Sequence, residues 1–262
     1  MKLGFIGMGN MAQALCGGFV SSGKITKENV YAYAPTYDKL AANADLFGFT
    51  PCKDVNEMVK CCDVLIMACK PYQIEGVLET VGEDLKGKAL VSVAAGWPYD
   101  KYMEYLDSSV RVQFVMPNTP AMVGEGVLIF EDKNSLSQEE RNEIKELFNA
   151  TGKIVELPSS LMGIGGAVSG CGPAFVDMFI EAYADAAVKY GIPRKTAYEM
   201  VSQTVLGSAK LQLDTGLHPG ILKDNVCSPN GTTICGVASL EKDGFRNACI
   251  SSIDAIMNKK SK

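Results

Sequence analysis

Two glycines near the start of the chain have the spacing that a dinucleotide-binding turn requires. Gly7 and Gly9, followed by Ala12, fit the pattern G-x-G-x-x-G/A between an apolar segment, residues 3–6, and a sequence typical of a helix. The first glycine permits a tight turn, the second admits a pyrophosphate to the backbone, and the helix start offers it free N–H groups. An ordinary glycine-rich turn is the alternative. The context favours dinucleotide binding by Ile6, Gly7, Met8, Gly9, Asn10 and Met11.

The residues after the second predicted strand bear on the choice of coenzyme. Enzymes that use NAD usually have an acidic residue there, which accepts from the ribose 2′-OH. This chain has Ala34, Pro35 and Thr36 instead. A carboxylate would repel a 2′-phosphate, so its absence permits NADPH, with NADH still open. Because no arginine is present either, Thr36 and Asn56 are the candidate phosphate donors.

Further predicted strands end at the same edge of the sheet as the glycine turn. In open α/β sheets, ligands bind at the carboxyl ends of the strands. The segment Met116–Pro120 follows one of these strands. Two other strand ends complete the predicted coenzyme contacts: Ala68, Cys69, Lys70 and Pro71, and Ala94, Ala95 and Gly96.

A second polar cluster lies near the C-terminus, directly before an apolar helical sequence. It comprises hydroxyl residues, a flexible Asn-Gly pair and the start of a helix, which together can form an anion site of backbone N–H groups. A plain capped helix explains this stretch equally well. The candidate residues are Ser228, Asn230, Gly231, Thr232 and Thr233.

The elements that must position these residues alternate through the first part of the chain. Apolar strands are predicted at 30–34, 49–52, 64–68, 89–94, 110–115, 126–130 and 153–157, with helices at 56–61, 73–81, 99–106 and 137–150. Strands alternating with helices indicate an α/β fold, a Rossmann-type doubly wound sheet. This dinucleotide-binding domain is predicted to span residues 1–158.

Residues 159–262 change pattern and predict an all-α domain for substrate binding and dimerisation, with helices at 173–190, 193–214 and within 231–258. Asp177, Glu181, Asp185 and Lys189 form one narrow polar stripe on the first of these helices. The rest of its surface is apolar and must be buried. A compact monomeric bundle is the alternative, and a second copy of the chain is the favoured cover.

The composition of the chain argues against several classes of protein. The chain has 262 residues and a net charge of −5, which argues against a nucleic-acid partner. No apolar run approaches the roughly 20 residues that span a bilayer, and the chain starts with a strand rather than a signal peptide. The nine cysteines, without metal-ligand spacing, indicate reduced thiols in a cytoplasmic protein and no metal site. His218, the single histidine, is expected to be structural.

The chain resembles the pyrroline-5-carboxylate reductase family over essentially its full length. The resemblance rests on GFIGMGNMAQAL, ACKP, VMPNTPAMVGEG, AVSGCGPAF and the whole segment 219–241. It implies a Rossmann domain, a helical domain that interlocks with a second subunit, and rings of dimers. It also implies hydride transfer from NADPH to 1-pyrroline-5-carboxylate, the last step of proline biosynthesis, with the substrate carboxylate in the Ser228–Thr233 loop.

Three positions depart from that family's usual pattern. Phe114 stands where arginine is common, Tyr72 where glutamine is usual, and Asn230 where glycine is usual. The last change is mild, because asparagine tolerates a left-handed backbone. None of these changes affects the glycine turn or the threonine pair.

The chemistry of the site favours an imine over a ketone as substrate. Reducing a ketone needs a proton donor for the developing alkoxide. Related hydroxyacid dehydrogenases supply a lysine, and the matching stretch here, residues 170–185, contains neither lysine nor histidine. A cyclic imine can bind already protonated, and Thr233 is the candidate catalytic hydroxyl. A hydroxyacid-type dehydrogenase and a non-catalytic dinucleotide-binding regulatory protein are the alternatives.

Overall fold

The computed structural model describes residues 1–259; residues 260–262 lie outside the described part of the chain. The chain forms two compact units, one comprising Met1–Gly170 and the other beginning at Cys171. The first unit extends through a glycine-rich helix that follows residue 158. The division of the chain at residue 158 stays a prediction.

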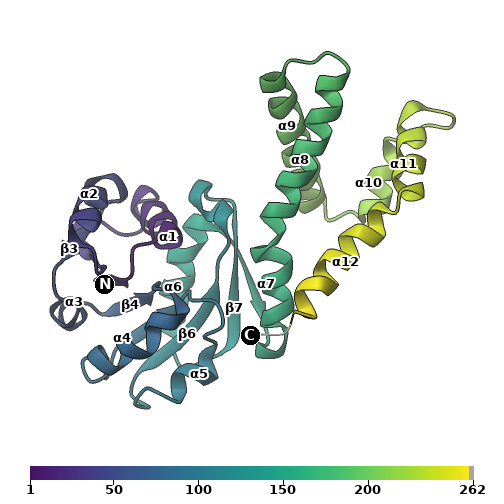
Figure 1. Cartoon of the computed structure of the whole chain (residues 1–262). Helices are drawn as coiled ribbons and strands as arrows, with labels where there is room; N and C mark the ends of the chain where they lie inside the picture. The colour runs from purple at the N-terminus through teal and green to yellow at the C-terminus, as the bar shows by residue number, and fades with distance from the viewer. Residues whose placement is uncertain (260–262) are drawn as a thin grey trace. The chain divides into compact units, whose positions relative to one another are not determined.

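An eight-stranded sheet forms the first unit (Figure 1), in the order β3-β2-β1-β4-β5-β6-β7-β8. Strands β1 to β6 are parallel, β7 is antiparallel to β6, and β8 is parallel to β7. The predicted parallel, doubly wound sheet is therefore confirmed. The strands are β1 (Leu3–Ile6), β2 (Val30–Tyr33), β3 (Thr50–Cys52), β4 (Val64–Met67), β5 (Ala89–Ser92), β6 (Arg111–Met116), β7 (Gly126–Asn134) and β8 (Gly152–Leu157).

Helices cover both faces of this sheet, because successive strand residues point to opposite sides. Phe5 of β1 packs in one core cluster with Phe19 and Phe148, and Ile6 packs in another with residues of α3 and α4. The helices are α1 (Asn10–Ser21), α2 (Tyr37–Phe47), α3 (Val55–Cys61), α4 (Ile74–Val81), α5 (Tyr99–Met103), α6 (Gln138–Phe148) and α7 (Met162–Gly170). Short 3-10 turns are η1 (Lys27–Asn29), η2 (Pro71–Gln73), η3 (Thr119–Val123), η4 (Asn149–Thr151) and η5 (Ser159–Leu161).

Two helices of this unit, α2 and α7, are absent from the sequence-based prediction. Glycine disfavours helices, so the glycine-rich sequence of α7 gives little local indication of one. The structure explains the glycines by close packing. A Cβ on Gly165 would lie 2.7 Å from Leu157 Cδ1, and one on Gly166 would lie 2.4 Å from Met116 Sδ. Contacts with the sheet, rather than the intrinsic helix propensity of its residues, therefore stabilise α7.

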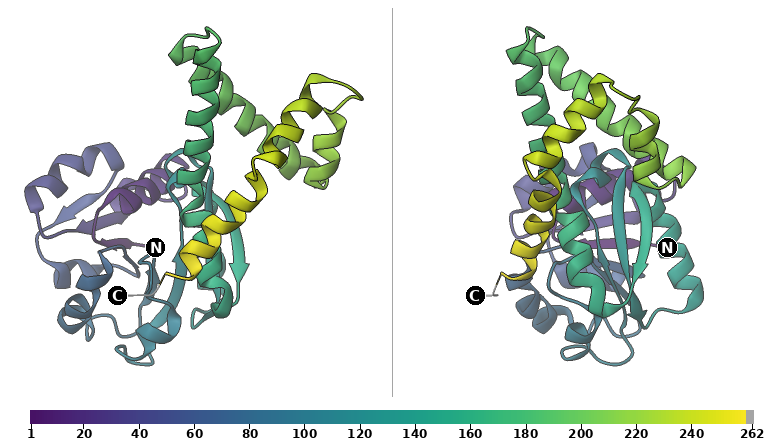
Figure 2. Two further views of the ribbon diagram at one scale, coloured as in Figure 1. Left: turned by 45° about the vertical axis from the view of Figure 1, so that its right-hand side comes forward. Right: turned by 90° about the vertical axis from the view of Figure 1, so that its right-hand side faces the viewer.

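The second unit contains only helices in its described part (Figures 1 and 2), as predicted. The long helices α8 and α9 run side by side, with Ala184 and Ala197 fully buried. Large apolar side chains remain exposed, among them Met178 at 67%, Leu206 at 54% and Ile250 at 63%. The helices are α8 (Gly172–Lys189), α9 (Arg194–Thr215), α10 (Pro219–Asn225), α11 (Thr232–Lys242) and α12 (Phe245–Met257). This unit therefore leaves many of its large apolar side chains exposed.

One stretch of the described chain, Ser159–Lys189, is long and apolar enough to cross a membrane by length and composition alone. The expectation that no such stretch exists is therefore wrong on those two criteria. The stretch comprises two helices rather than one, and the first of them, α7, packs on the sheet. One such stretch is weak grounds for a membrane protein, since the core helix of a soluble protein passes the same test of length and composition.

The exposed apolar side chains predict self-association through the second unit. Replacing Met178 and Leu206 together by arginine should weaken the assembly by burying unpaired charges. Analytical ultracentrifugation should show at least a tenfold weaker association, about 1.4 kcal/mol. Leu46→Arg is the matched control, because Leu46 is 75% exposed on α2 of the first unit. A monomer mass for the unmodified protein would contradict the prediction.

Candidate active site

The turn between β1 and α1 can only be made by glycine at its first position. Gly7 has φ +96, and a Cβ there would lie 2.7 Å from the backbone nitrogen of Cys69. Its N–H donates to the Tyr33 carbonyl oxygen at 2.8 Å. These contacts hold the ends of β1, β2 and β4 together. The turn predicted from the glycine spacing is present.

Gly9 leaves open space at the start of α1. It is the N-cap residue of that helix, in an extended conformation with φ −81, and no atom lies within 4 Å of a Cβ built on it. As a glycine, it offers no side chain to the unbonded N–H groups of the first helical turn. Open space beside such N–H groups fits the pyrophosphate of a dinucleotide.

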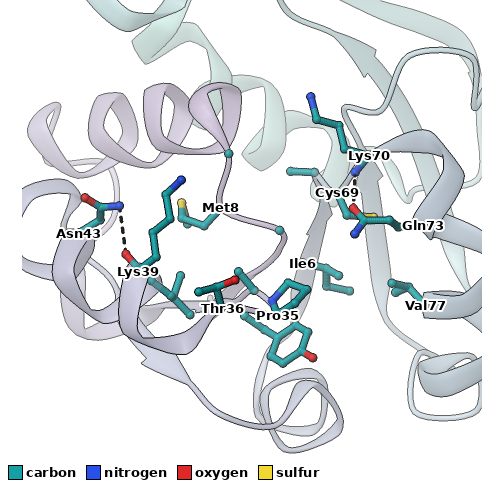
Figure 3. Close-up of a pocket in the computed structure, with 16 residues that line it drawn as sticks. Ile6, Met8, Pro35, Thr36, Lys39, Asn43, Cys69, Lys70, Gln73 and Val77 are labelled. Carbon is teal, nitrogen blue, oxygen red and sulfur yellow. Dashed lines mark hydrogen bonds between the residues drawn. The ribbon is translucent and has the colours of Figure 1, made fainter.

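A cavity of about 410 Å³ lies at the carboxyl ends of β1, β2 and β4 (Figure 3). Most of the residues predicted to bind coenzyme line it: Ile6, Gly7, Met8, Gly9, Ala34, Thr36, Ala68, Cys69 and Lys70. The structure adds Pro35, which stands between two predicted contacts, and six residues that sequence reasoning missed: Tyr33, Lys39, Leu40, Asn43, Gln73 and Val77.

Lys39 is the most informative of the added residues. It lies in the first turn of α2, three residues after the N-cap Thr36, and extends into the cavity beside Met8 (Figure 3). The Asn43 side chain donates to the Lys39 carbonyl oxygen at 3.2 Å. The sequence pattern predicts no helix here, so Lys39 is not among the candidate residues near Thr36. A helix N-terminus, a hydroxyl and an ammonium together fit a ribose 2′-phosphate.

The opposite side of the cavity is formed by the residues that follow β4. The Lys70 N–H donates to Gln73 Oε1 at 3.1 Å, which fixes the start of η2. Burial raises the pKa of the Cys69 thiol to about 11. The thiol is therefore neutral at physiological pH and adds no negative charge beside bound phosphates.

Several predicted coenzyme residues lie outside the lining of this cavity, and their contact with the coenzyme stays a prediction. Asn56 is the most suggestive of them, since its buried Oδ1 has no hydrogen-bond partner among the described residues. A buried polar atom without a partner is costly, and a ribose hydroxyl would satisfy it. The others are Asn10, Met11, Pro71, Ala94, Ala95 and Gly96.

The second predicted site, Ser228–Thr233, is a tight turn followed by α11. The Gly231 N–H donates to the Ser228 carbonyl oxygen at 3.0 Å, with Pro229 and Asn230 between them. Asn230 has φ 61 and is the sole non-glycine residue with positive φ in the described chain. Proline followed by a positive φ is the arrangement of a type II turn.

Glycine at the end of this turn gives room to a neighbouring hydroxyl. A Cβ on Gly231 would lie 2.4 Å from Ser228 Oγ, so the missing side chain leaves room for that hydroxyl. Gly231 is also the N-cap residue of α11, whose first residues are Thr232 and Thr233, both exposed. Hydroxyls and unbonded N–H groups at one helix start suit a carboxylate.

The residues that depart from the family pattern lie in different environments. Phe114 is 2% exposed and packs with Ile129 and Met162 in a small core cluster. Tyr72 is 83% exposed, within η2. His218 has the structural role expected of it, since its Nδ1 accepts from the Gly220 N–H at 3.0 Å and caps α10.

Fold and pocket together define a dinucleotide-binding oxidoreductase. A family model described as NADP oxidoreductase, coenzyme F420-dependent, matches residues 2–96, and one described as pyrroline-5-carboxylate reductase dimerisation matches residues 159–262. The chain belongs to the pyrroline-5-carboxylate reductase family, as its full-length relatives establish.

Those relatives are similar along their whole length. The pyrroline-5-carboxylate reductase of Escherichia coli is 40% identical over 262 residues, covering 100% of this chain and 97% of the relative. The pyrroline-5-carboxylate reductase of Methanosarcina acetivorans is 41% identical over 256 residues, covering 96% of this chain and 94% of that relative. A crystal structure of the Plasmodium falciparum enzyme with NADP bound matches with a TM-score of 0.88 at 34% identity, covering 98% of this chain and 95% of that one. The resemblance noted from the motifs is thus confirmed.

Replacement by alanine should have different effects at the two glycines of the turn between β1 and α1. Gly9→Ala should fold normally, because its backbone is extended and the added Cβ meets no protein atom, yet it should weaken coenzyme binding at least tenfold, about 1.4 kcal/mol. Gly7→Ala should instead destabilise the fold by about 1–3 kcal/mol through its positive φ. Coenzyme titration by fluorescence and thermal unfolding separate the two. Undiminished coenzyme affinity in Gly9→Ala would argue against a pyrophosphate at this turn.

Proposed function

We propose that the protein reduces 1-pyrroline-5-carboxylate to L-proline with a hydride from NADPH, as the last step of proline biosynthesis. The observation that supports the proposal is the Ser228–Thr233 turn, which places hydroxyl groups and the start of α11 together and contains no acid–base side chain. Because the family consists of reductases of this name, the substrate is the five-membered cyclic imine.

The coenzyme, when bound, supplies the hydride that reaches the imine carbon, the atom that becomes C5 of proline. The chain's residues supply position and electrostatics. Gly7, Gly9 and the N-terminus of α1 hold the pyrophosphate, while Thr36 and Lys39 hold the ribose 2′-phosphate. The remaining predicted coenzyme contacts, Asn56 among them, complete that surface.

The substrate carboxylate is held by Ser228, Asn230, Gly231 and Thr232 through hydroxyl and backbone N–H groups. The ring nitrogen enters already protonated, so no general acid is required. The Thr233 hydroxyl accepts a hydrogen bond from that nitrogen and fixes the ring plane. Transfer of the hydride converts the C=N bond into a C–N bond, and the proton already on nitrogen remains there.

The proposal extends to assembly and location. The protein acts as a homodimer held by its second unit, and larger rings of dimers are a further outcome for the same sedimentation measurement. A cytoplasmic location fits the nine cysteines, all of which are free.

Activity is tested directly with purified protein. Oxidation of NADPH should depend on added pyrroline-5-carboxylate and be followed by loss of absorbance. Activity on 3-hydroxyacids without activity on the imine would overturn the proposal in favour of a hydroxyacid dehydrogenase. Binding of coenzyme without turnover of either substrate class would indicate a non-catalytic protein.

Substitutions of Lys39 and Thr36 should change the preference of the protein between NADPH and NADH. Lys39→Met removes a cation from the 2′-phosphate and should raise the KM for NADPH about tenfold while hardly affecting that for NADH. Thr36→Asp should act in the same direction by repulsion. Lys53→Met is the control, since Lys53 lies over the Tyr37 ring and does not line the cavity. Equal losses for both coenzymes would show that neither residue contacts the 2′-phosphate.

Replacing Thr233 by alanine separates catalysis from helix capping. If its hydroxyl contacts the ring nitrogen, turnover should fall about ten- to a hundredfold, the cost of one hydrogen bond to a charged group, on the order of 1.5–3 kcal/mol. Coenzyme affinity should be unchanged, because the phosphates bind at Gly7 and Gly9. A lowered melting temperature with unchanged turnover would instead make Thr233 a helix-capping residue.

A further inference from the structure

We infer that Gln13 is a positioning residue for the coenzyme, because its side chain fixes the peptide between Met8 and Gly9 in the turn proposed to bind the pyrophosphate. The inference rests on the coenzyme contacts of the proposed function and extends them. All the residues concerned belong to the first unit. Gln13 lies in α1 and does not line the coenzyme cavity, so it acts on the coenzyme through the turn.

The contact is a hydrogen bond from a side chain to the backbone. The Gln13 Nε2 donates to the Met8 carbonyl oxygen at 3.0 Å. Among the described residues, no backbone N–H donates to the same oxygen. The Gln13 amide is therefore the group that holds this carbonyl in one direction.

The direction of this carbonyl determines the direction of the next N–H. The peptide between Met8 and Gly9 is trans, as are all peptide bonds of the described chain. In a planar trans peptide, the C=O and the N–H point in opposite directions. Since the Met8 C=O points toward the Gln13 amide, the Gly9 N–H points away from it. Gly9 lines the cavity, and within the described residues its N–H has no hydrogen-bond partner, so it is available to a phosphate oxygen.

The backbone around this peptide is otherwise weakly restrained. Gly7 and Gly9 flank Met8, and glycine adopts more backbone conformations than other residues. No atom lies within 4 Å of a Cβ built on Gly9. The Met8 side chain packs in the core cluster that contains Phe5 and Phe19, but apolar contacts are non-directional and do not fix a peptide plane. A hydrogen bond depends on direction and does fix it.

An N–H that is oriented before binding raises the affinity for its ligand. Ordering a flexible group during binding costs free energy, and a group that is already ordered avoids this cost. We expect the hydrogen bond from Gln13 to contribute a factor of about three to ten in coenzyme affinity. Because NADPH and NADH share the pyrophosphate, the factor should be the same for both. Lys39, by contrast, should affect NADPH alone.

Gln13→Met is the most direct test, because methionine has a similar length, no charge and no N–H donor. The Kd for NADPH and the Kd for NADH should both rise about three- to tenfold, as measured by fluorescence titration. Gln13→Ala provides a second variant should Gln13→Met fail to fold, since alanine is the strongest helix former. It removes the same donor and should weaken both coenzymes in the same way.

A ligand without the pyrophosphate separates positioning from a general loss of structure. 2′-AMP carries the adenosine and its 2′-phosphate but no pyrophosphate. Its affinity, measured by titration calorimetry, should be the same in Gln13→Met and in the unmodified protein. Equal weakening of 2′-AMP and NADPH would mean that the whole cavity is disturbed, and it would overturn the positioning role.

Gln138→Met is the matched control. Gln138 is the first residue of α6 in the same unit, and its Nε2 donates to Asn142 Oδ1 at 2.9 Å. It does not line the coenzyme cavity. The substitution removes the same amide from the first unit and should leave the affinities for NADPH, NADH and 2′-AMP unchanged.

Equilibrium binding keeps the inference separate from the proposed function, because none of these titrations needs pyrroline-5-carboxylate. An unmodified protein that binds NADPH but does not reduce the imine would overturn the proposed function, and weaker coenzyme binding by Gln13→Met would then still support the positioning role. NADPH binding by Gln13→Met as tight as that of the unmodified protein would overturn the positioning role, whatever the activity. A loss for NADPH with none for NADH would also overturn it, since the effect would then lie at the 2′-phosphate.

Discussion

The contact on which the first unit depends is the close approach of Gly7 to the backbone that follows β4. A Cβ at Gly7 would lie within 2.8 Å of three backbone atoms of Ala68 and Cys69. Hydrogen bonds from Gly7 to the end of β2, and from Ala68 to the end of β1, complete the junction. This approach brings three strand ends to one point and directs the start of α1 toward the cavity. The coenzyme cavity therefore follows from the packing of backbone against backbone rather than from any single polar side chain.

The second unit differs from the first in having almost no buried core of its own. Within its described residues, Ala184 and Ala197 are the only side chains assigned to the buried core. Helices with so little interior cannot be stable alone, because apolar burial must offset the entropy of ordering the chain. A family model described as pyrroline-5-carboxylate reductase dimerisation matches residues 159–262, and a second subunit would provide the missing cover. The Ser228–Thr233 turn thus belongs to the unit that we propose is stabilised by assembly.

Much of this fold could be predicted because its determinants are local. Continuous apolar runs predict the parallel strands, and the spacing of Gly7 and Gly9 predicts the turn between β1 and α1. Two helices were missed for different reasons. Helix α7 is glycine-rich and forms through contacts with Leu157 and Met116, which no local pattern encodes. Helix α2 was not recognised, and Lys39 was missed with it, because only a helix places it one turn beyond Thr36.

The cavity lining could be predicted at strand ends but not beyond them. Gln73 and Val77 reach the cavity from the start of α4 and its preceding turn, so their contribution depends on how that helix packs. The sequence places Asn118 only at a strand end, because the hydrogen bond from its side chain to the Ser169 carbonyl oxygen spans 51 residues. Such long-range hydrogen bonds leave no periodic pattern. The roles of Ser228 to Thr233 stay predictions, since a turn shows where an anion fits but not which one.

The measurement that tests the central claim most directly follows the transferred atom. The protein would be incubated with pyrroline-5-carboxylate and NADPH carrying deuterium at C4 of the transferring face, and the product analysed by mass spectrometry. The account predicts proline with a single deuterium at C5. Coenzyme oxidation without labelled proline, or unlabelled proline, would contradict it.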